Sequence, residues 1–265
     1  MAISAPIGAF PYHPYCGAPP APDDIWRRWN LDPVLLAALA TIWVGYLFLA
    51  RRRELTRRQQ ALFSVGWSLT SLALICPICP LSVALFSARV GQHMFLVSVA
   101  APLVASGWPP REGSPSSARW SPILAAGAFA AALWIWHSPV PYVATFQSTA
   151  IYWLMHLTTF GAALWLWRSI FFAWRRSLEG AAVAILVTVL QMGVLGAVIT
   201  FAPRPLYAPH LYTAMSWGLT PLQDQQLGGV IMWVPAGVLL AAVLAAGFAE
   251  ALSRSEPRVQ ARPAT

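Results

Sequence analysis

The sequence contains no lysine and few charges of either sign. Charged residues make up 10% of the 265 residues, whereas soluble domains carry roughly 25%. Hydrophobic residues make up 58%, so the chain cannot cover itself with water-facing side chains and needs lipid around it. All 17 basic residues are arginine, and they give a net charge of +8. No soluble basic domain carries that charge, and we therefore expect no nucleic-acid partner.

The sequence also lacks the residues of common transporter and enzyme sites. No Asp or Glu lies in the middle of an apolar stretch, which argues against a proton-driven transporter or a site for a hard cation. No glycine-rich phosphate loop, HExxH or GxSxG motif occurs. We therefore expect a protein that is not an enzyme, and we assign no catalytic residue.

Long apolar runs dominate what is present. A helix needs roughly 20 apolar residues to cross the hydrocarbon core of a membrane. Seven stretches are candidates: Pro33–Ala50, Ala61–Cys76, Val90–Gly107, Ser121–Trp136, Thr149–Phe172, Gly180–Phe201 and Gly228–Leu252. The second stretch is short and ends at prolines, so Pro77–Ser87 is expected to be an interfacial or re-entrant piece. The sequence predicts an all-α polytopic membrane protein with seven transmembrane helices, interacting with membrane lipid.

This pattern divides the chain into three parts. Residues 1–30, rich in Pro and Ala, are expected to form a floppy N-terminal tail; they lack the basic start and continuous apolar core of a standard signal peptide. Residues 31–252 form the seven-helix membrane domain, and residues 253–265 a short polar tail.

The arginines predict the orientation. Thirteen of them fall on alternate connections, which a seven-span arrangement places on one side of the membrane. They are Arg51, Arg52, Arg53, Arg57, Arg58, Arg111, Arg119, Arg168, Arg175, Arg176, Arg254, Arg258 and Arg262. Arginine-rich connections face the cytoplasm. We therefore expect the N-terminus and its tail outside, in the periplasm of a bacterium, and the C-terminal tail in the cytoplasm.

Soft and nitrogenous metal ligands gather near the predicted outer side. His93, His137 and His156 lie near helix ends there, with His93 in the first turn of its helix and His156 about two turns deep. Cys76 and Cys79 in "CPICP" close the second stretch at the same side, and Met94 follows His93. Sulfur with imidazole selects Cu(I), whereas imidazole alone suits Cu(II), zinc or haem iron. This pattern favours metal handling or haem ligation.

Plainer roles remain open for each of these residues. A histidine near a helix end often forms an interfacial hydrogen bond, and a methionine in an apolar helix usually packs. Cys76 and Cys79 could form a disulfide or be two small apolar residues. Cys16 lies three residues from His13, and that pair could also bind a metal.

Asp224 precedes the last apolar stretch. A carboxylate there favours the positive end of the helix dipole, so capping of that helix is its plain interpretation. Pairing with Arg204 or Arg89 on the same side is the alternative.

Five segments occur in a telling order: "QHMFLVSVAAPLVASGWP" (Gln92–Pro109), "WHSPVPY" (Trp136–Tyr142), "MHLTTFGAALWLW" (Met155–Trp167), "TFAPRPLY" (Thr200–Tyr207) and "PLQDQQLGGVIMWVP" (Pro221–Pro235). Together they resemble a known family, the multi-span cytochrome c oxidase assembly factors (CtaG) of the caa-type oxidases. The resemblance covers about Leu31 to Leu252. Arg89 and Val90 stand where many members of that family carry a further His-Met pair.

The resemblance implies a multi-pass protein of the bacterial plasma membrane that acts in respiratory chain biogenesis. It implies a metallochaperone that supplies or stabilises copper at the periplasmic face. The expected partners are cytochrome c oxidase subunits and a periplasmic copper donor. The family residues map onto His93, His137, His156 and Asp224, and Cys76, Cys79 and Met94 are added as candidate ligands. The alternatives are a haem-binding membrane redox protein, using facing histidines such as His93 and His156, and a metal-free assembly scaffold.

Overall fold

The computed structural model describes residues 11–108, 121–174 and 178–255, and within them the chain is helical without a strand. Of the arginines that predict the orientation, Arg111, Arg119, Arg175, Arg176, Arg258 and Arg262 lie outside the described residues. The helices are α1 (Pro33–Arg52), α2 (Arg57–Ile75), α3 (Ile78–Ala84), α4 (Phe86–Phe95), the π-helical turn η2 (Leu96–Ala100), α5 (Ala101–Gly107), α6 (Ser121–His137), α7 (Pro139–Gln147), α8 (Thr149–Trp174), α9 (Leu178–Thr200) and α10 (Pro221–Ser255). Short 3-10 turns are η1 (Ile25–Arg27), η3 (Ala208–Leu211) and η4 (Ala214–Trp217).

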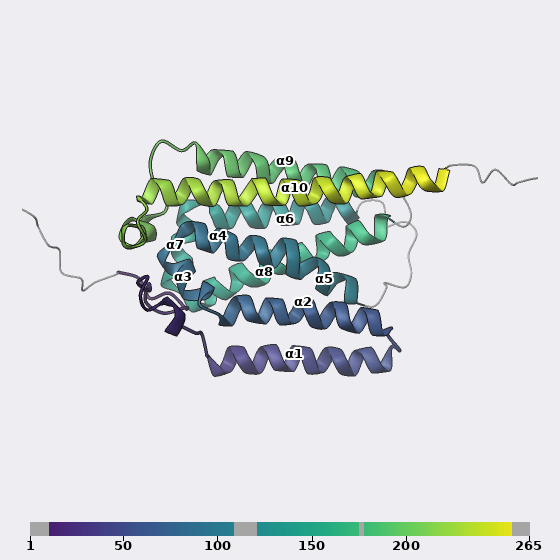
Figure 1. Ribbon diagram of the computed structural model, residues 1–265, viewed down its shortest axis with the longest axis horizontal. Helices are drawn as coiled ribbons and strands as arrows, with labels where there is room; N and C mark the ends of the chain where they lie inside the picture. Colours follow the sequence, from purple (N-terminus) through teal and green to yellow (C-terminus); the bar gives the residue numbers. More distant parts are fainter. Residues whose placement is uncertain (1–10, 109–120, 175–177, 256–265) are drawn as a thin grey trace, which may run out of the picture.

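The long helices run side by side as one bundle (Figure 1). We call one end of the bundle the disulfide end; it carries the N-terminal segment, α3, α7, η3 and η4. We call the other the arginine end; it carries the turn between α1 and α2, where Arg51, Arg52, Arg53, Arg57 and Arg58 lie. Helices α1, α4, α8 and α10 run from the disulfide end toward the arginine end, and α2, α6 and α9 run back.

Several of these helices suit a membrane. Within the described residues, α1, the stretch Phe86–Gly107 and the stretch Glu179–Thr200 are long and apolar enough to cross one. Two bent pairs add further candidates, α2 with α3 at 48° and α6 with α7 at 72°. Three spans, or up to five with the bent pairs, are therefore supported by length and composition.

One face of α9 shows what surrounds the bundle. Its apolar side chains recur every four residues on the outside, and each is about half exposed: Leu186, Leu190, Val194 and Val198. A continuous apolar stripe of this kind is costly in water and is stable against lipid chains.

The bends coincide with proline and with helix capping. Thr56 and Gln59 form a capping box that begins α2, and the helix ends just before Cys76 and Pro77. The predicted re-entrant piece is the short helix α3. Helix α7 lies between two predicted stretches and was not predicted; Pro139 and Pro141 stand in its first turn, where proline is tolerated because no N–H is needed.

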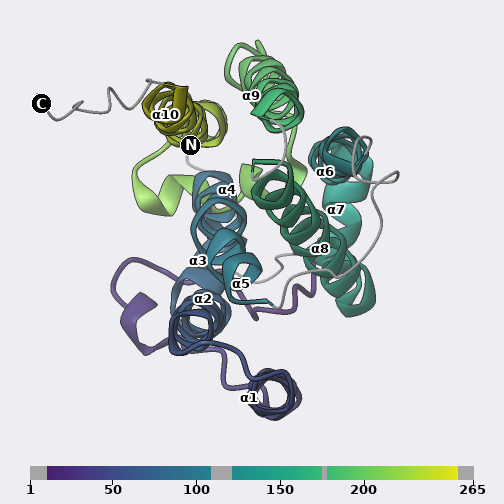
Figure 2. The ribbon, with the colours of Figure 1, turned by 90° about the vertical axis from the view of Figure 1, so that its right-hand side faces the viewer.

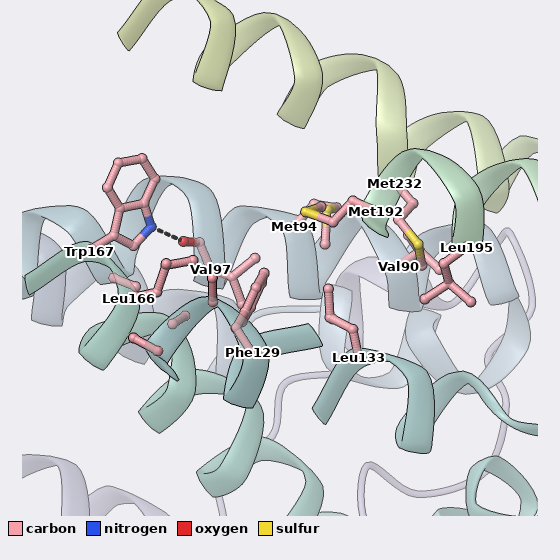
Figure 3. Packing of buried hydrophobic residues seen from close by; sticks show 14 of the residues in the cluster. Val90, Met94, Val97, Phe129, Leu133, Leu166, Trp167, Met192, Leu195 and Met232 are labelled. Atoms are coloured by element: carbon pink, nitrogen blue, oxygen red, sulfur yellow. Dashed lines mark hydrogen bonds between the residues drawn. The ribbon is translucent and has the colours of Figure 1, made fainter. Parts of the chain in front are cut away.

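The start of α4 corrects the predicted depth of His93. The helix begins at Phe86, four residues before the predicted start at Val90, so His93 lies in its third turn rather than its first. Farther along, the π-helical turn η2 precedes Pro102, which has no N–H to donate. The indole of Trp167 on α8 donates to the carbonyl of Val97 at 2.7 Å and ties the widened turn to α8 (Figure 3).

Helix α1 lies at the edge of the bundle, next to α2 (Figure 2). A groove of about 750 Å³ runs between α1 and α8 over α2 and α5. Its walls are almost entirely apolar, and His156 lies at its floor. The groove therefore brings one predicted site residue close to the lipid-facing side of the bundle.

The N-terminal segment is not a floppy tail from residue 11 onward. The backbone N–H of Asn30 donates to the carbonyl of Ile75 at 2.8 Å. The Tyr15 hydroxyl donates to the carboxylate of Asp32 at 2.5 Å, and this hydrogen bond lowers the pKa of Asp32. Asp32 also caps α1 by accepting from Val34 N at 2.9 Å. These contacts hold the segment on the disulfide end.

Candidate functional site

Two of the predicted histidines face each other inside the bundle. His93 from α4 and His156 from α8 have ring centroids 5.1 Å apart, with the ring planes at 73°. Both are buried, at 6% and 7% exposure. Helices α4 and α8 run in the same direction from the disulfide end, so the two rings sit at a similar depth although they are 63 residues apart in sequence.

The outer nitrogens of this pair have no protein partner. The Nε2 atoms of His93 and His156 are buried, and neither forms a hydrogen bond. The other ring nitrogen of His156, Nδ1, lies 3.2 Å from the carbonyl of Tyr152, which fixes the ring. Buried polar groups are normally paired, so two unpartnered nitrogens on neighbouring rings make this pair the candidate site.

The immediate surroundings of the pair are tight. A cavity of about 10 Å³ lies against His93, His156 and Thr159, and the hydroxyl of Thr159 is likewise buried without a partner. The surface exposed to this cavity is apolar. Support for a ligand at this site therefore comes from the unpaired nitrogens and not from the cavity.

His137 stands at the edge of this pair. It ends α6 as predicted, and its ring centroid is 6.5 Å from that of His93. Its Nδ1 lies 2.8 Å from the carbonyl of Leu133. Within the described residues no group of three or more His, Cys, Asp or Glu side chains is arranged to hold a metal ion. The structure thus supports a pair, with His137 beside it, and does not show the predicted shared site of three histidines.

A buried arginine lies above the pair. Arg89 is 2% exposed and precedes His93 by one helical turn. Its guanidinium lies 4.5 Å from the centre of the Phe146 ring and 5.0 Å from that of Tyr142, and it donates to Thr145 Oγ1 at 2.6 Å. The aromatic faces and one hydroxyl replace water around the charge.

The cysteines depart from the prediction. Cys79 is joined to Cys16 by a disulfide, so it is not a free thiolate beside Cys76, and Cys16 is not free to bind a metal with His13. Cys76 is a free cysteine at the end of α2. Sequence reading paired the two nearest cysteines; the partner comes instead from the N-terminal segment, which the fold brings onto α3.

Met94 is a packing residue. It is 6% exposed and belongs to the main apolar cluster, where Figure 3 shows it beside Met192. These contacts are those of its plainer packing role, and Met94 as a metal ligand stays a prediction.

Asp224 caps a helix, but a different one from that expected. Its carboxylate accepts from Phe86 N at 2.7 Å, Ser87 N at 3.0 Å and Ser87 Oγ at 2.5 Å, so it caps α4 from its own position in α10. Within the described residues its contacts include no ion pair with Arg89 or Arg204. The carboxylate satisfies the free N–H groups that begin α4.

The two neighbours of Asp224, Gln223 and Gln225, also form structural hydrogen bonds. Gln223 forms a capping box with Thr220, which begins α10. Gln225 accepts from Leu206 N at 2.6 Å and donates to the carbonyl of Ile199 at 3.1 Å, holding the loop between α9 and α10. Residues Gln223, Asp224 and Gln225 thus fix the disulfide end and position α4, which bears His93.

Sequence reading gave no role to His210, which the structure places beside Tyr142. Its Nε2 lies 2.6 Å from the Tyr142 hydroxyl, and its Nδ1 lies 3.3 Å from the carbonyl of Ala84. Burial, with a smaller contribution from the charge of Arg89, lowers the pKa of His210 to about 3, so the ring is neutral at physiological pH.

Comparison with known proteins gives one match. A family model described as cytochrome c oxidase caa3 assembly factor matches residues 42–254, which is most of the chain. No curated protein and no solved structure matches the chain significantly. The matched range includes His93, His137, His156 and Asp224, and it leaves out Cys16.

Proposed function

The chain belongs to the cytochrome c oxidase caa3 assembly factor family, and from this membership we propose that it supplies or stabilises copper for the oxidase at the outer face of the membrane. The copper is cargo that His93 and His156 hold on its way to an oxidase subunit. The partners in this proposal are a copper donor on the outer side and the oxidase subunit that receives the ion.

The observation that carries the proposal is the pair of unpartnered Nε2 atoms on facing, buried imidazoles. Neutral imidazole nitrogen is a ligand for copper. Ligating histidines commonly have their other ring nitrogen held by a backbone carbonyl, as Tyr152 holds His156. Two ligands from the protein leave the rest of the coordination shell to a donor or acceptor protein, as transfer requires.

The geometry favours an ion over a haem. Pockets for cofactors occupy roughly 300–1,000 Å³. The groove of about 750 Å³ is lined by His156 but not by His93, and the cavity against both rings is about 10 Å³. A haem between His93 and His156 would require the two helices to separate. A metal-free scaffold is the second candidate. It is favoured by Asp224, Gln225 and His210, whose polar groups form hydrogen bonds that hold the disulfide end together.

We further propose that the helices cross a bacterial plasma membrane seven times, with the disulfide end outside. The arginines of the turn between α1 and α2 lie at the opposite end, which is the cytoplasmic end by the positive-inside rule. A disulfide persists on an oxidising face and is rare in the cytosol. The two arguments are independent and agree.

A fusion experiment tests this orientation. A reporter that is active only outside the plasma membrane, joined after Ala144 in α7, should be active. The same reporter joined after Arg58 should be silent, because that residue lies at the arginine end. The opposite pattern would place the histidine pair near the cytoplasm and remove the proposed route for copper.

Removing either ring of the pair should abolish copper binding. We expect His93→Ala and His156→Ala each to weaken Cu(I) binding by at least about 100-fold, since even the loss of an outer hydrogen-bond partner costs roughly 10- to 100-fold. The measurement is a Cu(I) titration of the reduced, purified protein against a competing chelator. In cells, the same variants should lower the amount of assembled oxidase while the variant protein stays abundant.

His13→Ala is the matched control, because His13 is exposed on the N-terminal segment and lies outside the pair. It should bind copper like the wild type. A protein that binds no Cu(I) while both histidine variants still support oxidase assembly would reject the copper proposal and leave the metal-free scaffold.

A further inference from the structure

The N-terminal segment is fastened over the disulfide end by a single covalent bond. The disulfide joins Cys16 to Cys79 of α3, with Cα atoms 5.6 Å apart and 63 residues between them in sequence. Around it, His13 N donates to the carbonyl of Phe146 at 3.1 Å, and the Tyr15 ring stacks on Tyr152 at 5.0 Å. Residues 12–16 therefore lie on α7 and the start of α8. We call these five residues the cover.

The histidine pair lies directly beneath this cover, one layer down. The cover touches Phe146 and Tyr152, and both of these rings face the guanidinium of Arg89. His156 follows Tyr152 by one helical turn and His93 follows Arg89 by one turn, which is about 6 Å deeper along each helix. From the disulfide end the cover and then the Tyr152 ring lie over the pair, and Tyr15 of the cover also lines the groove that reaches His156 from the side.

The two sulfurs of the disulfide have different surroundings. Cys16 is partly exposed, whereas Cys79 is fully buried. The Asn30 amide donates toward Cys79 Sγ at 3.6 Å, whereas the Tyr152 hydroxyl lies near both sulfurs, 3.3 Å from Cys16 Sγ and 3.8 Å from Cys79 Sγ, so the Asn30 amide is what sets Cys79 apart. Hydrogen-bond donors stabilise a thiolate, and a stabilised thiolate is the better leaving group. Attack on Cys16, with Cys79 leaving, is the accessible direction of exchange.

We propose that the Cys16–Cys79 disulfide is a redox-controlled fastening that closes the outer route to the His93–His156 pair, and that a dithiol reductant on the outer side opens it. One reductant thiolate attacks Cys16 Sγ, the S–S bond breaks, and Cys79 leaves as a thiolate that takes up a proton. The second reductant thiol then displaces Cys16. The reductant ends as a disulfide and the chain as two thiols, so two electrons and two protons pass to the chain.

Release of the bond leaves the cover held by weak contacts. Loss of a disulfide that closes a long loop strongly increases local opening. The Tyr15 ring then no longer pins Tyr152, and the pair becomes reachable from the disulfide end. The inference concerns access to the pair whichever ion it serves, so its test contains no copper.

The test measures how fast each histidine is modified by diethyl pyrocarbonate in the full-length protein in lipid nanodiscs. Mass spectrometry gives the rate for each residue, and it verifies the disulfide before and after treatment with dithiothreitol. We expect reduction to speed modification of His93 and His156 by at least about tenfold. His13 is exposed in the oxidised state, so its modification rate serves as the internal standard for the amount of reagent.

Two variants serve as controls for this experiment. Cys16→Ser should be modified fast at His93 and His156 with or without dithiothreitol, because it has no fastening to lose. Cys76→Ser keeps the disulfide and should follow the wild type. Equal rates for the oxidised and reduced wild type, or three free thiols in the oxidised protein, would overturn the proposal. The wild-type comparison needs no variant, so a poorly folding variant does not affect it, and failure here would leave copper binding untouched.

Discussion

Asp224→Ala should be among the most damaging single substitutions in this chain, lowering the free energy of unfolding by about 2–5 kcal/mol. The side chain is fully buried, and its two oxygens accept from the backbone N–H groups of Phe86 and Ser87. Alanine leaves both donors unpaired in an interior without water, at about 1–3 kcal/mol each. The measurement is the unfolding midpoint of the purified protein in detergent or nanodiscs.

The effect should also reach the histidine pair. Helix α4 begins at the two residues that Asp224 holds, and Arg89 and His93 follow one and two turns later. A start of α4 that is no longer fixed lets His93 move relative to His156. Cu(I) binding should therefore fall together with stability, although Asp224 touches neither ring.

Two variants calibrate this result. Asp224→Asn keeps one acceptor oxygen and should lose about half as much stability, since one N–H is still satisfied. Glu179→Ala removes an exposed carboxylate from the first turn of α9 and should change stability by no more than about 0.5 kcal/mol. An Asp224→Ala protein as stable as the wild type would show that α4 begins without this cap.

The apolar runs predicted the first and last residues of a helix well where its exposed side chains are apolar. The prediction Thr149–Phe172 compares with the observed α8, Thr149–Trp174, and Gly180–Phe201 with α9, Leu178–Thr200. These helices expose apolar side chains over most of their length, so composition and helix coincide. Three further stretches, Pro33–Ala50, Ala61–Cys76 and Ser121–Trp136, were placed within a few residues of α1, α2 and α6.

The prediction failed where polar residues are satisfied by other helices. Helix α10 begins at Pro221 rather than Gly228, because Asp224 and Gln225 bond to α4 and to the loop after α9. Helix α4 begins at Phe86 rather than Val90, because the polar Arg89 is enclosed by α7 and α8. A single sequence shows that these residues are polar and does not show which distant groups pair with them.

The same limit applies to the site. Residue types and positions near helix ends singled out His93 and His156, but whether the two rings face each other depends on how α4 and α8 are rotated, which packing sets. The Cys76–Cys79 spacing suggested a pair, and the bond to Cys16 depends on a chain path that no local pattern contains. Local spacing therefore predicted candidates, and tertiary packing selected among them.

Arg89→Met should tighten Cu(I) binding at the histidine pair by about 10- to 100-fold. The guanidinium lies about one helical turn, roughly 6 Å, above the rings. Two positive charges at that distance repel by about 3 kcal/mol at an effective dielectric constant of 20. Within the described residues the one ion pair joins Arg28 to Asp24, so Arg89 forms no ion pair with a carboxylate there.

A site that passes its cargo on benefits from this repulsion. In the proposed transfer, an ion held by His93 and His156 would sit beside the fixed positive charge of Arg89, which would lower its affinity and speed its release to an acceptor. The Arg89→Met protein should therefore bind copper more tightly and release it more slowly to a competing chelator. In cells it should support less oxidase assembly than the wild type despite carrying more copper.

The Arg89→Lys variant tests the effect of the positive charge separately from that of the planar guanidinium. It keeps a positive charge in the same enclosure, although it loses part of the stacking on Phe146 and Tyr142, so its copper affinity should stay within a few-fold of the wild type. Stability should change little in Arg89→Met, because a buried charge without a partner costs about as much as its contacts return. Weaker copper binding in Arg89→Met than in Arg89→Lys would show that the guanidinium organises the pair instead of opposing its cargo.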